Sequence, residues 1–231
     1  MSNLKDLEKE IKVNFTNHDL LQQAMVHRSY INEHPNFRMG HNERLEFLGD
    51  AVLEIIVTEY LYKSFPDKPE GDLTNWRASL VNSKMLYKIA NKLNFDKFLL
   101  LSKGESKDKN SKARHYILAD SVEAVIGAIY LDQGLETAKE FILNNVITNL
   151  DEIIKNKTYV DPKSRFQEMS QEIVGITPSY QVLKEEGPDH AKKFTIGLYL
   201  NEELITTGEG FSKQEAQTKA AEEGLKAKKW F

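Results

Sequence analysis

The spacing of the apolar residues changes along this chain, and the change limits the folds that it can form. From Asp19 to Leu150, apolar residues recur every three or four positions, which is typical of amphipathic helices. In the last third of the chain the spacing becomes strict alternation, which marks a half-buried strand at Phe194, Ile196, Leu198 and Leu200. The sequence therefore predicts an all-α region followed by a smaller α+β region.

Two long helices stand out in the all-α region. We expect one from about Asn42 to Phe65 and another from about Tyr116 to Asp132, because a proline or glycine follows each of them. Two segments between these helices are expected to be loops, 66–72 from its turn-forming residues and 103–114 from its cluster of basic residues.

The α+β region opens with a helix-start signal, Asp161 followed by a proline. It is expected to contain a helix to Val174, three strands, and a final helix that begins with a capping box at Ser212 and Glu215. The predicted segments are a first domain over residues 1–154, a linker over 155–160 and an α-β-β-β-α domain over 161–231.

Composition excludes several classes of site. The chain has no cysteine, which rules out disulfides, thiolate nucleophiles and cysteine-based zinc sites and favours the cytoplasm. No apolar stretch is long enough to cross a bilayer. The Gly-x-x-x-x-Gly-Lys motif of nucleotide-binding loops is missing, so no nucleotide cofactor is expected. The net charge of −4 has the wrong sign for a generic polyanion binder, so any RNA binding must depend on positioned residues.

Acidic residues form a stripe on each of the two long predicted helices. Glu43, Glu46 and Asp50 lie within roughly 60° of one helix face, and Asp120 and Glu123 lie one turn apart on the other helix. Like charges at these spacings destabilise a helix, and a hard divalent cation such as Mg²⁺ would offset that repulsion. The alternative is a solvated acidic face. A di-iron centre is disfavoured because no histidine follows these acids at Glu-x-x-His spacing.

Phe47 lies on the acidic side of its helix, away from the expected apolar positions Leu45, Leu48, Val52, Ile55 and Ile56. It therefore projects either toward a partner surface or toward a local cover within the chain.

Three segments resemble the ribonuclease III family in the family's order: NERLEFLGDAVL, PEGDLTNWRASLVNS and ILADSVEAVIGAIYLD. The resemblance implies an all-helical nuclease domain that acts as a homodimer, in which Phe47 inserts into a hollow of the other subunit. It implies Mg²⁺ as the cofactor, with Mn²⁺ as a substitute, and Glu43 and Glu70 as supporting acids. The implied metal ligands are Glu46, Asp50, Asp120 and Glu123, of which Asp50 and Glu123 are the catalytic residues.

The last seventy or so residues resemble a double-stranded RNA-binding domain through PKSRFQE, GPDH and GEGFSKQEAQTKAAEEGL. Domains of this kind recognise A-form RNA by shape. The likeness implies RNA contacts by Gln167, Glu168, His190 and Lys213. The chain departs from the family at Gln214, where a second basic residue is usual, and we therefore expect a weakened phosphate contact.

Together these features predict an endoribonuclease that cleaves double-stranded RNA. The family resemblance implies that cleavage leaves 5′-phosphate and 3′-hydroxyl ends. The resemblance further implies processing of ribosomal RNA precursors, messenger RNA and other structured RNAs. A second hypothesis is an RNA-binding regulator whose helical domain only dimerises, which is disfavoured because all four ligand positions are acidic. A third, a carboxylate metal-storage or oxidase bundle, is disfavoured by the missing histidines and by the RNA-binding tail.

Overall fold

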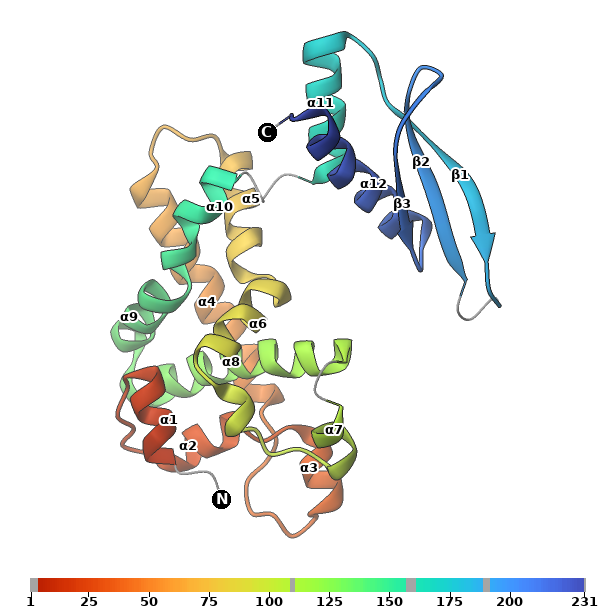
Figure 1. Cartoon of the computed structure of the whole chain (residues 1–231). Coiled ribbons are helices and arrows are strands. Elements are labelled where there is room, and N and C mark those ends of the chain that lie inside the picture. The colour runs from red at the N-terminus through yellow and green to blue at the C-terminus, as the bar shows by residue number, and fades with distance from the viewer. Residues whose placement is uncertain (1–3, 109–110, 157–160, 189–191, 231) are drawn as a thin grey trace. The chain divides into compact units, whose positions relative to one another are not determined.

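The computed structural model describes residues 4–108, 111–156, 161–188 and 192–230. The chain divides into two compact units, Met1–Ile154 and Lys155–Phe231, which are considered separately (Figure 1). The first unit is helical, and the second combines helices with a three-stranded sheet. The predicted fold class is therefore confirmed. Within the described ranges, no helix has both the length and the apolar character needed to span a membrane.

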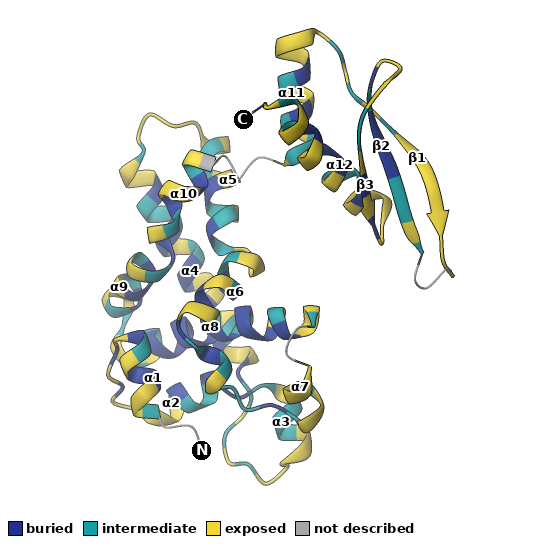
Figure 2. Ribbon diagram, in the orientation of Figure 1, coloured by how far each residue is buried: buried dark blue, intermediate teal, exposed yellow. Residues whose placement is uncertain are grey.

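The first unit is built around two 22-residue helices, α4 (Glu43–Ser64) and α8 (Lys112–Gln133). Figure 2 shows α8 buried along most of its length, and α4 packs across it. The surrounding helices are α1 (Leu4–Ile11), α2 (His18–Ala24), α3 (Arg28–Glu33), α5 (Glu70–Val81), α6 (Ser83–Lys92), α7 (Lys103–Lys107), α9 (Leu135–Asn145) and α10 (Leu150–Asn156), with single 3-10 turns at Phe95–Lys97 and Ile147–Asn149. Fully buried side chains such as Leu53, Leu61, Ile126 and Ile129 form the core.

The point where α4 crosses α8 depends on two glycines. A Cβ atom at Gly49 would collide with the backbone oxygen of Glu123 and would lie 2.9 Å from the backbone nitrogen of Gly127. A Cβ atom at Gly127 would in turn collide with the backbone oxygen of Leu45. Because neither helix carries a side chain at this point, the two backbones touch directly, and the crossing is fixed by backbone sterics.

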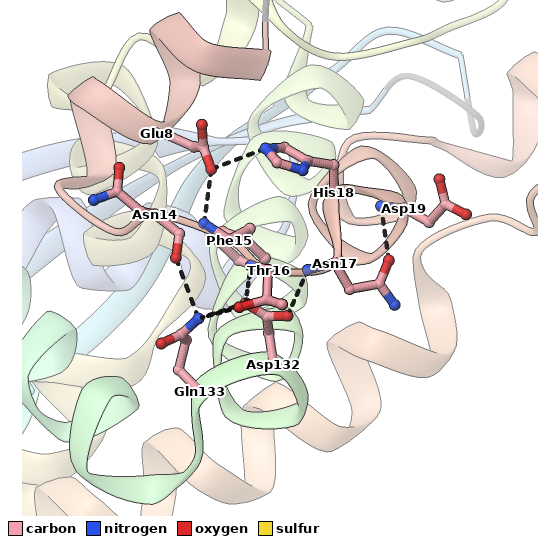
Figure 3. Close-up of polar contacts among 9 residues, drawn as sticks. All are labelled: Glu8, Asn14, Phe15, Thr16, Asn17, His18, Asp19, Asp132 and Gln133. Atoms are coloured by element: carbon pink, nitrogen blue, oxygen red, sulfur yellow. Dashed lines mark hydrogen bonds and ion pairs between the residues drawn. The ribbon is translucent and has the colours of Figure 1, made fainter.

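The far end of α8 is anchored by polar contacts to the N-terminal segment (Figure 3). The Asp132 carboxylate accepts hydrogen bonds from the backbone nitrogens of Thr16 (2.9 Å) and Asn17 (2.8 Å), and Gln133 donates to the backbone oxygen of Asn14 (3.2 Å). These contacts hold the connection between α1 and α2 against the end of α8, so the helix is fixed at this end as well as at its crossing with α4.

Both expected loops in the first unit are correct only in part, and residues 66–69 lie outside the helices as predicted. Helix α5 begins at Glu70, inside the segment 66–72. The basic segment 103–114 contains the short helix α7, and α8 begins at Lys112 because the Ser111 hydroxyl accepts a hydrogen bond from the backbone nitrogen of Arg114 (3.1 Å). Arg114 is not a solvated loop cation: its side chain is 3% exposed and is paired with Asp96.

The second unit has the predicted α-β-β-β-α order. Helix α11 (Pro162–Val174) precedes the strands β1 (Ser179–Glu186), β2 (Lys193–Leu200) and β3 (Glu203–Gly210), which form an antiparallel sheet with β2 in the centre, and α12 (Lys213–Lys228) follows. The side chains of Asp161 and Ser212 cap the two helices as expected. The hydrophobic core of this unit consists of Phe166, Leu198, Leu200, Ala220, Ala221 and Trp230.

Part of the expected linker is helical. Helix α10 extends to Asn156, which takes in the first two residues of the segment 155–160. The remaining residues, 157–160, lie outside the described residues.

Gly49→Ala should destabilise the protein because the added methyl group collides with the backbone of α8, and overpacking of this kind costs about 3 kcal/mol. Gly71→Ala is the matched control, since a Cβ atom at this helical position meets nothing within 4 Å, and it should change stability by less than about 1 kcal/mol. Thermal and urea unfolding measure both variants. Equal stability of the two variants would contradict the proposed steric role of the crossing.

Candidate active site

The crossing of α4 and α8 brings the two predicted acidic stripes to one place. Glu46 and Asp50 lie on either side of Gly49 in α4, and Gly49 contacts the backbone of Glu123 in α8. Asp120 lies one turn before Glu123 on the same helix. The four carboxylates therefore come from two rigid helices whose backbones are in contact, rather than from loops.

The pKa values of these acids show that they share one electrostatic environment. Burial raises the pKa of Glu123 to about 8, and the charges of Asp50, Asp120 and Glu46 add to this effect. Burial likewise raises the pKa of Glu46 to about 7, with contributions from Asp120, Glu43 and Asp50. Burial also raises the pKa of Asp120. Each helix thus feels the charges of the other, and the acids form one centre, called here the carboxylate centre: Glu46, Asp50, Asp120 and Glu123.

The chemistry of the carboxylate centre fits a hard divalent cation. Carboxylate oxygens are the ligands that Mg²⁺ and Mn²⁺ prefer, and the raised pKa values show acids whose charges lack a positive partner. Among the residues that the structure describes, however, no group of three or more histidine, cysteine or acidic side chains is already gathered as a metal site. Burial is the largest cause of the raised pKa values of Glu46 and Glu123, and neighbouring carboxylate charges add to it.

Glu43 lies at the edge of the carboxylate centre, in contact with two basic side chains that sequence reasoning missed. Arg28 Nη1 lies 3.6 Å from Glu43 Oε1, and His41 Nδ1 lies 3.7 Å from Glu43 Oε2. These residues, with Ile31 and Asn32, line a cavity of about 340 Å³. Arg28 begins the short helix α3, and its contact with Glu43 joins two separate helices, which no periodic pattern indicates. His41 lies just before α4, two residues from Glu43 in the sequence.

Glu70 lies apart from the carboxylate centre within one chain. It is exposed, accepts a hydrogen bond from the Thr74 hydroxyl (2.8 Å), and lines a hollow of about 660 Å³ beside Leu61 and Tyr62. Leu61 is roughly 16 Å along α4 from Asp50. The structure therefore does not bring Glu70 to the four acids of its own chain.

The face of α4 that carries Phe47 is exposed and apolar. Phe47 is 82% exposed, which leaves it without a cover in the chain itself. Ile55, expected among the buried apolar positions, is instead 60% exposed, and Tyr62 is 74% exposed. The expectation for Ile55 was wrong because Ile56, its neighbour, takes the core position.

In the second unit, the residues expected to contact RNA lie on the two helices. Gln167 and Glu168 are adjacent and exposed on α11. Lys213 is the first residue of α12, and its Nζ lies 3.3 Å from Glu185 Oε1 of β1. His190 lies outside the described residues.

Comparison with known proteins follows the division into two units. A family model described as "Ribonuclease-III-like" matches residues 17–150, and one described as "Double-stranded RNA binding motif" matches residues 162–228. Ribonuclease 3 of Carboxydothermus hydrogenoformans is 47% identical over 96% of this chain and 94% of its own length, and that of Enterococcus faecalis is 42% identical over 96% of each. The crystal structure of the nuclease domain of ribonuclease III from Campylobacter jejuni is 43% identical, with a TM-score of 0.57 over 64% of this chain and 97% of that one.

A helical nuclease domain followed by a double-stranded RNA-binding domain defines a ribonuclease that acts on duplex RNA. The chain belongs to the ribonuclease III family and is an endoribonuclease that cleaves double-stranded RNA. Enzymes of this family depend in general on a metal ion.

The raised pKa of Glu123 makes stability depend on pH in the metal-free protein. Between about 4.5 and about 8, the folded state holds a proton on Glu123 that the unfolded chain releases. The free energy of unfolding should therefore fall as pH rises through this window. Glu123→Gln carries no charge at any pH and should reduce this fall.

Urea unfolding in a chelator, at both ends of this pH window, measures the effect. The exposed Glu140, on α9, provides a control, and Glu140→Gln should leave the pH dependence of the wild type in place. Identical pH profiles for Glu123→Gln and the wild type would show that Glu123 does not bear the raised pKa.

Proposed function

We propose that this endoribonuclease uses Mg²⁺, held by Glu46, Asp50, Asp120 and Glu123, to hydrolyse phosphodiester bonds in double-stranded RNA. The observation that carries the proposal is the backbone contact between α4 and α8 at Gly49, which supports a shared site for acids of two different helices. The pKa values of Glu46 and Glu123, raised by burial and by acids of the opposite helix, are consistent with it. Mn²⁺, which takes the same oxygen ligands, is expected to substitute. Asp50 and Glu123 are proposed as the catalytic pair because they come from opposite helices at the Gly49 contact.

The chain's own residues account for orientation and charge at the site. When bound, a divalent ion lowers the pKa of water and neutralises charge on the phosphate oxygens. The carboxylates must be deprotonated to hold it, so the raised pKa values of Glu46 and Glu123 predict weaker metal affinity as pH falls. Glu43, one turn before Glu46, supports the site from its edge. Hydrolysis by water is proposed to leave 5′-phosphate and 3′-hydroxyl ends.

The second unit is proposed to hold the RNA duplex. Gln167 and Glu168 of α11 and the sequence-predicted His190 are assigned to the minor grooves, which dsRNA-binding domains read by shape. Lys213 is assigned to a phosphate, supported by its place at the start of α12, where free backbone N–H groups favour an anion. The proposed boundaries of this unit and the nuclease unit are residues 161–231 and 1–154, joined by a linker over 155–160.

We further propose that the protein acts as a homodimer through the exposed face of α4. One solved relative, the nuclease domain from Campylobacter jejuni, has a region "involved in dimer formation". In this chain Phe47 is uncovered, and the hollow beside Leu61 and Tyr62 is of a size to receive an aromatic ring. Insertion of Phe47 there would bring the partner subunit's Glu70 toward Asp50, which explains how Glu70 supports a centre from which it is separated within one chain.

The proposed substrates are ribosomal RNA precursors, messenger RNAs and other structured transcripts, and the proposed location is the cytoplasm. Both follow from membership of the ribonuclease III family rather than from any single residue of the site. Two carboxylate centres in a dimer would allow both strands of one duplex to be cut in a single encounter.

Glu123→Gln should reduce cleavage of a long perfect RNA duplex by at least about 100-fold, because it removes a proposed metal ligand and catalytic group. Its affinity for the duplex should stay close to that of the wild type, since the proposed RNA contacts lie in the other unit. Fragment sizing and end analysis with Mg²⁺ and with a chelator measure cleavage. Glu140→Gln is the active control. Equal fragmentation in chelator, or loss of binding together with cleavage, would contradict the proposal.

Phe47→Ala should weaken the dimer by about 2 kcal/mol or more, as expected when an aromatic anchor is removed from a pocket. Leu131→Ala, at a 54% exposed position near the end of α8, is the control and should leave association unchanged. Sedimentation equilibrium over a range of protein concentrations measures the two dissociation constants. An unchanged constant for Phe47→Ala would exclude Phe47 from the interface.

A further inference from the structure

The ammonium group of Lys213 already has an anionic partner in its own unit. Its Nζ lies 3.3 Å from Glu185 Oε1 and 5.6 Å from the centroid of the Phe194 ring. Glu185 pairs in register with Phe194 across β1 and β2, so the glutamate and the ring lie side by side beneath the start of α12. The other carboxylate oxygen of Glu185 lies 3.8 Å from Lys192 Nζ. One carboxylate therefore engages two lysines.

The first turn of α12 carries no basic side chain other than Lys213. Gln214 follows Lys213, and Gln217 accepts a hydrogen bond from Lys163 (2.7 Å) rather than carrying a charge itself. Lys219 is paired with Glu215 at 3.0 Å. Lys213 is thus the basic residue of the first turn of α12, and its ammonium group is paired with the Glu185 carboxylate.

We propose that Glu185 sets the affinity of this unit for duplex RNA by competing with a phosphate for Lys213. The inference rests on the phosphate contact proposed above for Lys213. A phosphate that approaches the start of α12 must replace the Glu185 carboxylate, and it meets the negative charge of Glu185 beside it. The Lys213 ammonium group also lies over the face of the Phe194 ring, which attracts the cation.

Exposure of the pair determines the size of the effect. The Lys213 and Glu185 side chains are 57% and 39% exposed, so water screens their attraction and the pair contributes little to stability. Replacing Glu185 should therefore leave the fold intact while changing RNA affinity by about two- to five-fold. The expected change is an increase in RNA affinity. A variant with a damaged fold would instead bind RNA more weakly.

The experiment measures binding of the full-length protein to a short labelled RNA duplex in chelator, over a range of salt concentrations. Glu185→Gln should tighten binding by about two- to five-fold at low salt, and the gain should shrink as salt rises. Lys213→Ala should weaken binding and lower the slope of log K against log salt by about one. The double variant Glu185→Gln/Lys213→Ala should lose the gain.

Glu186→Gln is the matched control. It removes the same charge one residue along β1, from a carboxylate that pairs with Lys184 at 2.7 Å rather than with Lys213. A gain for Glu185→Gln that exceeds the gain for Glu186→Gln, and disappears without Lys213, supports the proposal. Equal effects of the two variants would overturn it, since net charge alone would then be responsible. If Lys213→Ala leaves affinity unchanged, the phosphate contact of Lys213 fails, and the role of Glu185 fails with it.

Discussion

The contact between the backbones of α4 and α8 determines both the core of the first unit and its chemistry. Because Gly49 and Gly127 carry no side chain, the two helices approach more closely than any larger residue at these positions would allow. The same contact fixes the distance between Glu46 and Asp50 on one helix and Asp120 and Glu123 on the other. The proposed catalytic centre therefore depends on packed helices rather than on the conformation of a loop.

The carboxylate centre is held together against its own electrostatics. Burial of Glu46 and Glu123 opposes their ionisation at neutral pH, and the charges of neighbouring acids add to the cost. The packing of α4 on α8 compensates for this repulsion, with fully buried residues such as Leu53 and Ile126 close to the crossing. Burial of one such side chain contributes about 1.5–3 kcal/mol. The apolar contacts of the two helices thus offset the cost of keeping the acids close together.

Local sequence signals were sufficient for much of the architecture. Helical spacing located α4 almost to the residue, and Asp161 and Ser212 marked the starts of α11 and α12 through their side-chain caps. Periodicity placed the two acidic stripes on helix faces, but the meeting of the stripes depends on the long-range contact at Gly49. The same limit explains the error at Arg114, whose partner Asp96 belongs to a different element.

Other features required the folded chain. The contact of Arg28 with Glu43 joins helices α3 and α4, which no local pattern connects. Of the adjacent apolar residues Ile55 and Ile56, only Ile56 is buried, and helical periodicity is too coarse to predict which of the two faces the core. The contact between Lys213 and Glu185 joins a helix to a strand of the sheet, so the sequence indicated Lys213 as a phosphate ligand but gave no sign of the carboxylate that engages it.

The closed core of the second unit has a consequence for how such a chain can diversify. Phe166, Leu198 and Trp230 pack with one another inside residues 161–231, so this module needs no apolar surface from its neighbour to fold. This core therefore belongs to the module itself, whatever precedes it in the chain. RNA binding and RNA cleavage can therefore change separately. A residue such as Glu185 can alter the proposed RNA affinity of the second unit while the crossing of α4 and α8, the proposed site of cleavage, stays the same.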